Sequence, residues 1–208
     1  MTPTEPGAAR PALLAVLAHP EDESFGMGGT LARYAASGAN VYYACATGGE
    51  EGSFDPEHLV GYASIAERRQ AELDCAARAL GLSGVVMLGY RDSGMAGAAS
   101  NQHPEALAAQ PLDAVAARVC EEIRRLRPQV VVTFDPIGGY RHPDHIAIQQ
   151  ATVLAFHAAG DPARFPGEYP PYAPQKLYFQ TFSRRVLRAA VRLMPLFRQD
   201  PRAFGRNK

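Results

Sequence analysis

The chain of 208 residues carries 21 basic and 21 acidic side chains, and 47% of its residues are hydrophobic, a balance typical of a globular domain and not of a disordered or fibrous chain. Because the formal net charge is zero, no overall field would recruit nucleic acid or an anionic membrane, and nucleic acid is not expected as a partner. The three cysteines, Cys45, Cys75 and Cys120, are scattered, which excludes a cysteine metal cluster and a disulfide scaffold and fits a reducing compartment.

The longest early apolar run covers residues 11–18 and is too short to cross a bilayer. His19 and three acidic residues follow it, where a secretory leader would have a cleavage site of small residues. The protein is therefore predicted to be cytoplasmic, without a transmembrane segment.

Strands and helices are expected to alternate along the chain. A continuous apolar run predicts a buried strand over residues 12–18, and apolar spacing predicts a helix over 28–37 that ends at Gly38. Further strands are expected at 41–46, 85–88, 130–134 and 176–182, and further helices at 62–80, 112–126 and 144–158. This alternation predicts an α/β fold over residues 1–182: a single three-layer domain with a Rossmann-like, mostly parallel sheet and helices on both faces.

The last segment, residues 183–208, has a different composition. It holds seven Arg and one Lys against one Asp, with apolar residues that could share one helical face until Pro195. One interpretation is a helix packed on the domain with a solvated basic side. The other is a helix that binds a membrane surface or phosphate groups.

Two short clusters concentrate histidines and carboxylates. The first, residues 19–23 (His-Pro-Glu-Asp-Glu), follows the first strand, and the second, residues 140–145 (Tyr-Arg-His-Pro-Asp-His), follows the fourth strand and opens a helix. In doubly wound sheets, ligands bind beyond the carboxyl ends of the strands, where the strand order reverses. With a strand order of 3-2-1-4-5 both clusters would meet at that reversal.

These side chains are the donors that a catalytic metal site requires. His19 and Asp22 can turn toward one ion, and a histidine of the second cluster would complete a set of three ligands with an open position for water. A remaining carboxylate could accept a proton, and a histidine or tyrosine could stabilise an oxyanion. The pattern favours metal-assisted amide hydrolysis. A non-haem iron site is the alternative on ligand chemistry, and a dinucleotide site is disfavoured because the first strand is followed by acids instead of G-x-G-x-x-G.

The two clusters resemble the motifs of the LmbE-like (PIG-L) family. Members of this family are zinc enzymes that remove N-acyl groups from amino sugars, and their two motifs usually read His-Pro-Asp-Asp-Glu and His-Pro-Asp-His. The similarity extends from about residue 12 to at least 182, and includes residues 47–52 (Thr-Gly-Gly-Glu-Glu-Gly), Arg69 with Glu72, and residues 91–95 (Arg-Asp-Ser-Gly-Met). The most similar members are of the type that acts on N-acetylglucosaminyl-inositol or its thiol conjugates.

The resemblance implies a role for each matching residue. Three residues are the expected metal ligands, for Zn²⁺ or another divalent ion such as Fe²⁺: His19, Asp22 and His145. Four residues are expected to act in catalysis. Glu21 would be the base, and Tyr140 would polarise the carbonyl. His142 would assist the oxyanion or the leaving group, and Asp144 would orient and charge His142. Three are expected to hold the sugar or its aglycone: Glu51, Arg69 and Asp92.

Without the resemblance, the last three residues have simpler interpretations. Arg69 could pair with Glu72 on an exposed helix face, Asp92 could start a turn, and Glu51 could be a solvated loop acid.

The sequence departs from the family at two places. Glu21 stands where the family has Asp, and its extra methylene moves the carboxylate by about 1.5 Å. A misplacement of about 1 Å can lower a rate by as much as a hundredfold. Members of this subtype also commonly continue beyond the equivalent of Lys208, so the chain is expected to be truncated or a shortened member.

The predicted function is metal-dependent removal of an N-acetyl group from a small molecule that contains N-acetylglucosamine. An amidase acting on sugar-linked thiol conjugates, and a catalytically weakened metal-containing binding protein, are the alternatives. The expected partner is the small amino-sugar substrate, and the oligomeric state is left open, a homo-oligomer included.

Overall fold

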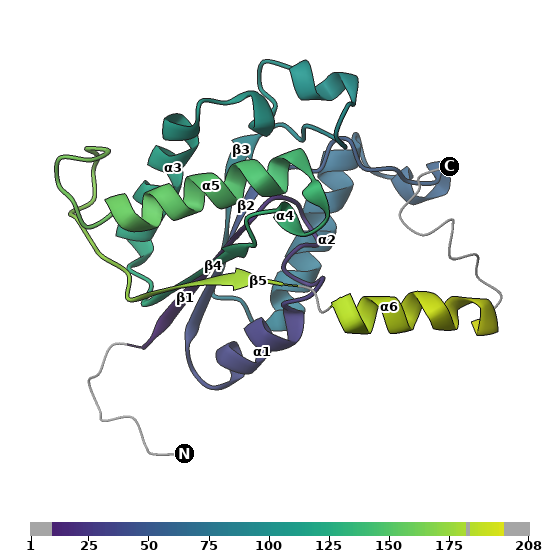
Figure 1. Cartoon of the computed structure of the whole chain (residues 1–208), viewed down its shortest axis with the longest axis horizontal. Helices are drawn as coiled ribbons and strands as arrows, with labels where there is room; N and C mark the ends of the chain where they lie inside the picture. The colour runs from purple at the N-terminus through teal and green to yellow at the C-terminus, as the bar shows by residue number, and fades with distance from the viewer. Residues whose placement is uncertain (1–9, 182–183, 198–208) are drawn as a thin grey trace.

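Parallel strands form one sheet at the centre of the computed structural model, which describes residues 10–181 and 184–197 (Figure 1). The strands are β1 (Ala12–Leu17), β2 (Asn40–Thr47), β3 (Gly84–Tyr90), β4 (Val130–Phe134) and β5 (Lys176–Gln180). Every neighbouring pair runs parallel, in the order β3-β2-β1-β4-β5. This is the order under which the two clusters of histidines and carboxylates would meet, and it reverses between β1 and β4.

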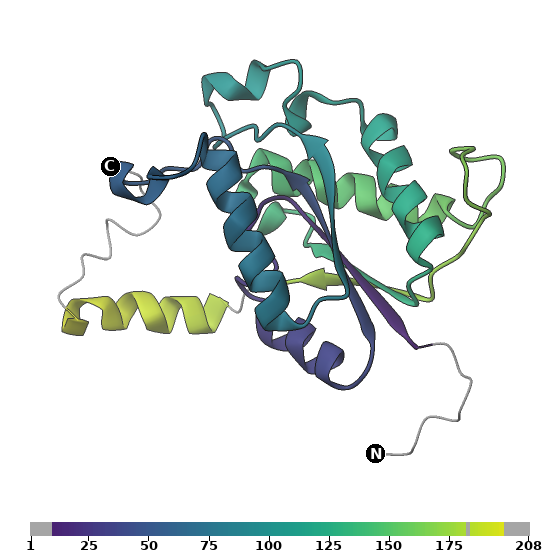
Figure 2. The ribbon, with the colours of Figure 1, turned by 180° about the vertical axis from the view of Figure 1, so that it is seen from behind.

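Helices cover both faces of this sheet, as predicted (Figures 1 and 2). On one face lie α1 (Gly28–Ala36) and α2 (Ile65–Leu80), and on the other lie α3 (Leu112–Leu126) and α5 (Pro143–Ala158). A short helical segment, α4 (Gly138–Arg141), precedes α5, and α6 (Arg184–Leu193) follows β5. Short 3-10 turns occupy Pro56–Leu59, Ala99–Gln102, Leu107–Ala109 and Met194–Phe197.

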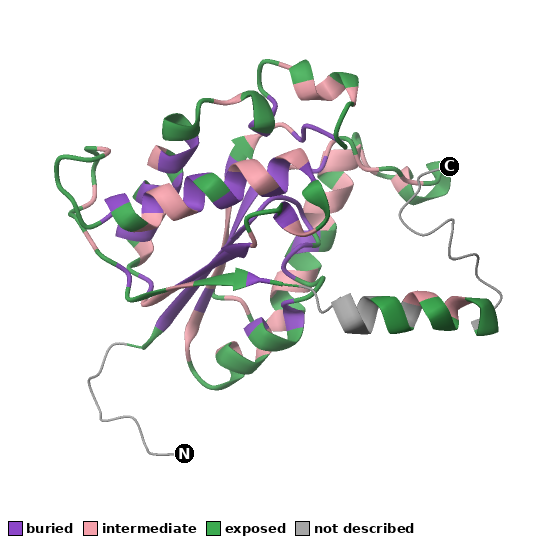
Figure 3. Cartoon of the chain, viewed as in Figure 1, coloured by how far each residue is buried: buried purple, intermediate pink, exposed green. Residues whose placement is uncertain are grey.

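The exposure of β1 and β5 follows from their positions in the sheet. All six residues of β1 are buried, because β1 lies mid-sheet with helices on both faces (Figure 3). The edge strand β5 exposes both Tyr178 and Phe179, although its sequence alternates. Position in the sheet therefore decides the exposure of this strand, and not the alternation of its residues.

The proline-rich connection from α5 to β5 is held by a buried arginine. Arg124, in the last turn of α3, donates to the backbone carbonyls of Ala159, Asp161, Arg164 and Phe165 at 2.5–3.0 Å. Only 4% of its surface is exposed. This single side chain replaces the backbone partners that an irregular segment lacks.

None of the helices within the described residues is long and apolar enough to cross a membrane. The basic segment predicted at the end of the chain contains α6, and its last residues, 198–208, lie outside the described part.

Candidate functional site

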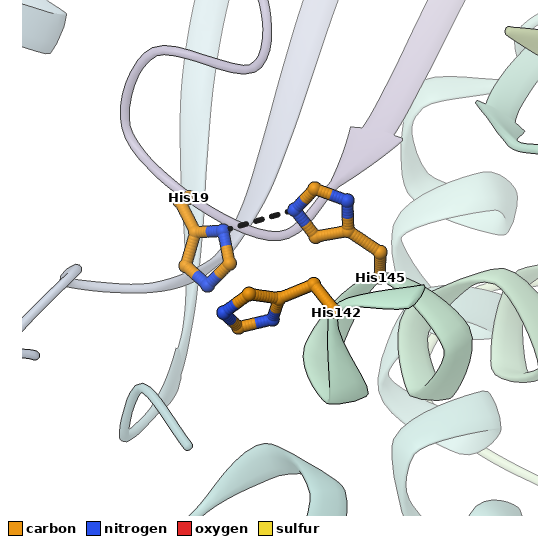
Figure 4. A group of neighbouring side chains, drawn as sticks. All are labelled: His19, His142 and His145. Carbon is orange, nitrogen blue, oxygen red and sulfur yellow. Dashed lines mark hydrogen bonds between the residues drawn. The ribbon is translucent and has the colours of Figure 1, made fainter. Parts of the chain in front are cut away.

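The two predicted clusters meet at the carboxyl ends of β1 and β4, where the strand order reverses. His19 follows β1, and both His142 and His145 lie at the start of α5. Figure 4 shows the three imidazole rings facing one another, and all three residues are buried. Pairing of β1 with β4 therefore joins side chains from opposite halves of the sequence.

The three expected metal ligands present their donor atoms as a compact triangle. His19 Nδ1 lies 3.2 Å from His145 Nε2 and 3.5 Å from Asp22 Oδ2, and His145 Nε2 lies 3.6 Å from Asp22 Oδ2. Tetrahedral ligands at zinc's usual bond lengths lie about 3.3–3.4 Å apart. The donor set and its spacing thus fit a tetrahedral divalent ion with a fourth, open position.

Hydrogen bonds fold the segment after β1 so that His19 and Asp22 turn the same way. Asp22 Oδ2 accepts the backbone N–H of His19 at 2.8 Å, and the Tyr43 hydroxyl donates to the His19 carbonyl at 2.6 Å. Glu23 is 1% exposed and accepts the backbone N–H of Glu21 at 3.0 Å. No sequence pattern indicates this role of Glu23, because the hydrogen bond forms only within the folded turn.

Glu21 adopts a backbone conformation that residues other than glycine rarely take. Its φ is 125°, and such strain persists only where the surroundings impose it. The Glu21 carboxylate accepts a hydrogen bond from Arg69, which also donates to the Pro20 carbonyl at 2.8 Å. Burial raises the pKa of Glu21, and the neighbouring guanidinium opposes that rise.

Arg69 reaches Glu21 because the loop after β2 leaves room for it. A Cβ on Gly49, whose φ is 70°, would stand 2.6 Å from the Arg69 Nε atom. The neighbouring Arg68 forms the helix-surface pair with Glu72, at 2.8 Å. The simpler interpretation of Arg69, as the partner of Glu72, is therefore wrong.

His142 caps helix α5 through its ring. Its Nδ1 atom accepts the backbone N–H of Asp144 at 3.2 Å, so the neutral ring carries its proton on Nε2. Burial and the nearby His19 lower the pKa of His142, which keeps the ring neutral. His142 is thus a hydrogen-bond donor at the edge of the donor triangle.

The Asp144 carboxylate lies beside His19 and Ser93. Its carboxylate contacts His19 Nε2 at 3.1 Å and accepts hydrogen bonds from the backbone N–H and the hydroxyl of Ser93. Only its backbone N–H bonds to His142. The Asp144 carboxylate thus bonds to His19 and not to His142, although its charge raises the pKa of His142. The role expected of Asp144 toward His142 stays a prediction.

Protonation of the histidines follows from their surroundings. Burial lowers the pKa of His145 to about 4, which favours the neutral ring that binds metals. Burial also lowers the pKa of His19, but hydrogen bonds to Asp144, Asp22 and Asp92 outweigh it and hold that pKa well above the usual value. Three carboxylates thus concentrate negative charge around one imidazole, which suits a cation beside it.

Tyr140 stands at the rim of the site. Its ring centroid lies 5.0 Å from that of His145 and 5.9 Å from that of His142, and 60% of the residue is exposed. It belongs to a segment whose other members, Gly138, Gly139 and Arg141, have φ values of 63°, 65° and 70°. This irregular backbone turns the tyrosine toward the histidines, and no sequence pattern predicted it.

The three residues expected to hold the sugar are brought to the same end of the sheet. Glu51 pairs with Arg91 at 2.9 Å, and Arg69 bonds to Glu21. Asp92 is 5% exposed, accepts the backbone N–H of Gly94 at 2.8 Å and lies 3.5 Å from His19 Nε2. Burial raises the pKa of Asp92, and hydrogen bonds from His19 and from the Gly94 backbone more than offset this, so the net shift is downward.

Comparison with known proteins gives one matching family. The sequence model described as "PIG-L: GlcNAc-PI de-N-acetylase" matches residues 14–156. A 1D-myo-inositol 2-acetamido-2-deoxy-alpha-D-glucopyranoside deacetylase of Thermomonospora curvata is 44% identical over 191 residues, which cover 88% of this chain and 64% of the relative. The protein of the same name from Kineococcus radiotolerans is also 44% identical, over 86% of this chain and 54% of the relative. The chain thus spans less than two thirds of the length of these curated relatives.

Solved structures share the fold. The conserved protein TT1542 from Thermus thermophilus has 32% identity and a TM-score of 0.60, over 82% of this chain and 66% of that one. The N,N'-diacetylchitobiose deacetylase from Pyrococcus horikoshii has 23% identity and a TM-score of 0.64, over 90% and 69%. The second similarity concerns the fold alone.

Proposed function

Because the chain belongs to the PIG-L (GlcNAc-PI de-N-acetylase) family, we propose that it is a metal-dependent hydrolase that removes the N-acetyl group from a small molecule containing N-acetylglucosamine. The observation that carries this proposal is the triangle of His19 Nδ1, Asp22 Oδ2 and His145 Nε2, with Glu21, His142 and Tyr140 beside it. Three ligands with further polar groups around an open position are the parts of a hydrolytic metal site.

We assign the metal to His19, Asp22 and His145, and Zn²⁺ is the ion that these donors suit best. A bound Zn²⁺ supplies a Lewis acid that activates water and polarises a carbonyl at neutral pH. Two histidines and one carboxylate also suit Fe²⁺.

Glu21 is assigned as the base that takes a proton from water. Its carboxylate is half exposed beside the triangle, and Arg69 fixes one of its oxygens. His142 donates from Nε2 to the developing oxyanion, since its Nδ1 accepts the Asp144 backbone N–H. The exposed Tyr140 hydroxyl is assigned to the same carbonyl oxygen from the other side, where preorganised donors stabilise the transition state.

The substrate proposed is a GlcNAc glycoside, and the names of the relatives favour inositol as its aglycone. Glu51, Arg69 and Asp92 are proposed to line the sugar side of the site, because all three lie at the carboxyl ends of β2 and β3 or on the adjoining helix. A cytoplasmic location is proposed as well, since the three cysteines form no disulfide within the described residues.

The proposed activity is tested with zinc-loaded protein and a panel of N-acetylglucosamine conjugates of inositol, malate, phosphatidylinositol and chitobiose. Release of primary amine and acetate from the inositol conjugate, abolished by a chelator and restored by Zn²⁺, is the expected result. Turnover confined to a sugar-linked thiol conjugate would identify the amidase alternative. Tight metal binding without turnover of any substrate would identify a binding protein, the interpretation that the unusual Glu21 supports.

A further inference from the structure

We infer that Ser93 is a positioning residue for the metal ligand His19 and that it acts through the carboxylate of Asp144. This inference rests on the proposed function, because it assigns His19 to the metal. Ser93 follows β3, and neither its residue type nor its place in the sequence connects it with His19.

Ser93 is bonded to Asp144 twice. Its backbone N–H donates to Asp144 Oδ2 at 2.9 Å, and its hydroxyl donates to Asp144 Oδ1. The hydroxyl oxygen accepts the backbone N–H of Ala108 at 2.9 Å, so its donor is directed to Asp144. Ser93 is 0% exposed, and no solvent competes for these bonds. Both oxygens of the carboxylate are therefore fixed by one residue.

Asp144 passes this constraint to His19. The carboxylate is 0% exposed, and its Oδ2 atom lies 3.1 Å from His19 Nε2. A second carboxylate oxygen, Asp92 Oδ1, lies farther from the same nitrogen, at 3.5 Å. With Nε2–H donating to Asp144, the lone pair of His19 is on Nδ1, the atom that belongs to the donor triangle.

Carboxylates that bind the second nitrogen of a metal-ligating histidine fix its tautomer and ring orientation. Loss of such a partner typically weakens metal affinity by about 10–100-fold. Without the Ser93 hydroxyl, Asp144 Oδ1 would be a buried carboxylate oxygen lacking a donor, and the side chain could rotate away from His19. Ser93 thus stabilises the geometry in which His19 Nδ1 faces Asp22 and His145.

The test is the zinc affinity of the metal-free protein, measured by competition with a chromophoric chelator. Ser93→Ala is expected to weaken zinc binding by about 10-fold or more. Ser100→Ala is the matched control, because Ser100 lies in the same loop and donates to the Ser93 carbonyl at 2.9 Å but does not touch Asp144. Ser100→Ala is expected to leave the affinity unchanged. A folded Ser93→Ala protein that binds zinc as tightly as the parent would overturn the inference.

A double-mutant cycle with Asp144→Asn tests whether Ser93 acts through Asp144. If it does, Ser93→Ala should weaken zinc binding much less in the Asp144→Asn background than in the parent. Full additivity of the two losses would overturn that route. Should Ser93→Ala unfold, Ser93→Cys keeps the volume with a weaker donor, and an unchanged affinity in that variant would count equally against the inference.

Failure of the inference and failure of the proposed function give different results. If the parent protein binds no zinc, the proposed metal site, and with it the proposed function, is wrong. If the parent binds zinc and releases amine, and the Ser93→Ala variant binds zinc equally tightly, only the role inferred for Ser93 is wrong.

Discussion

The guanidinium group of Arg69 donates to the carboxylate of Glu21, across 48 positions of the sequence. Helix α2 thereby holds the side chain that replaces the usual aspartate of the family, while the shorter aspartate would end about 1.5 Å farther from Arg69. The longer side chain at position 21 thus has a partner in the structure that the motif alone does not reveal.

This pair leads to a prediction for Glu21. Glu21→Gln should retain the metal, because Glu21 is not assigned as a ligand, and should lose about 10²–10⁴-fold in kcat, the usual contribution of a general base. Steady-state rates and metal content of the same preparation measure both effects. An unchanged rate in Glu21→Gln would remove Glu21 as the base.

Glu21→Asp tests the reach of the side chain. We expect lower activity than in the parent, because aspartate would not reach Arg69 from the present backbone. Higher activity in Glu21→Asp would mean that the longer glutamate lowers the rate and that its pairing with Arg69 does not assist catalysis.

Each proposed ligand should be required for metal binding. His19→Ala, Asp22→Ala and His145→Ala are expected to lose metal and activity together, since a site with three protein ligands has none to spare. Metal content measured by mass spectrometry checks this, with the exposed His157→Ala on the same helix α5 as the control. Stoichiometric metal in any of the three variants would show that the ligand is wrongly assigned.

Tyr140→Phe should lower kcat more than it raises KM. A hydroxyl that bonds to the developing oxyanion acts mainly in the transition state, and removal of such a donor costs about 10²-fold or more. Tyr178→Phe, at an exposed position of β5, is the control and should behave like the parent. A raised KM with an unchanged kcat would assign Tyr140 to substrate binding.

Stability should depend on Arg124. Arg124→Met would leave four backbone carbonyls of the connection between α5 and β5 without their donor. Hydrogen bonds to charged groups contribute about 1.5–3 kcal/mol each, so we expect a loss of about 3 kcal/mol or more in the free energy of unfolding, measured with urea. Arg125→Met removes only a surface pair with Glu122 and should cost less than about 1 kcal/mol. Equal effects of the two variants would contradict the role given to Arg124.

The architecture was predictable because it follows from local patterns. The apolar run of residues 12–18 identifies a strand buried on both faces, and Gly81, whose φ is 71°, ends α2 where the sequence predicts. The helix at Leu112–Leu126 and the strand at Val130–Phe134 have the bounds expected from periodicity.

The details of the site were less predictable, because they depend on contacts between distant residues. Ser93 and Asp144 are 51 positions apart, and a serine after a strand has no pattern that marks such a partner. The resemblance placed Asp144 beside His142, its neighbour in the sequence, whereas the folded chain turns the carboxylate to His19. The turn of Tyr140 likewise depends on an Arg141 in a conformation that favours glycine.

The donor triangle also constrains how the protein folds. His19 and His145 are 126 positions apart, and they meet only after β1 has paired with β4. Closing so long a loop is entropically costly and slow, so an unfolded chain offers the metal no preformed site. Metal bound by all three residues would therefore be expected only after β1 has paired with β4, and its uptake would report that the chain has reached its final topology.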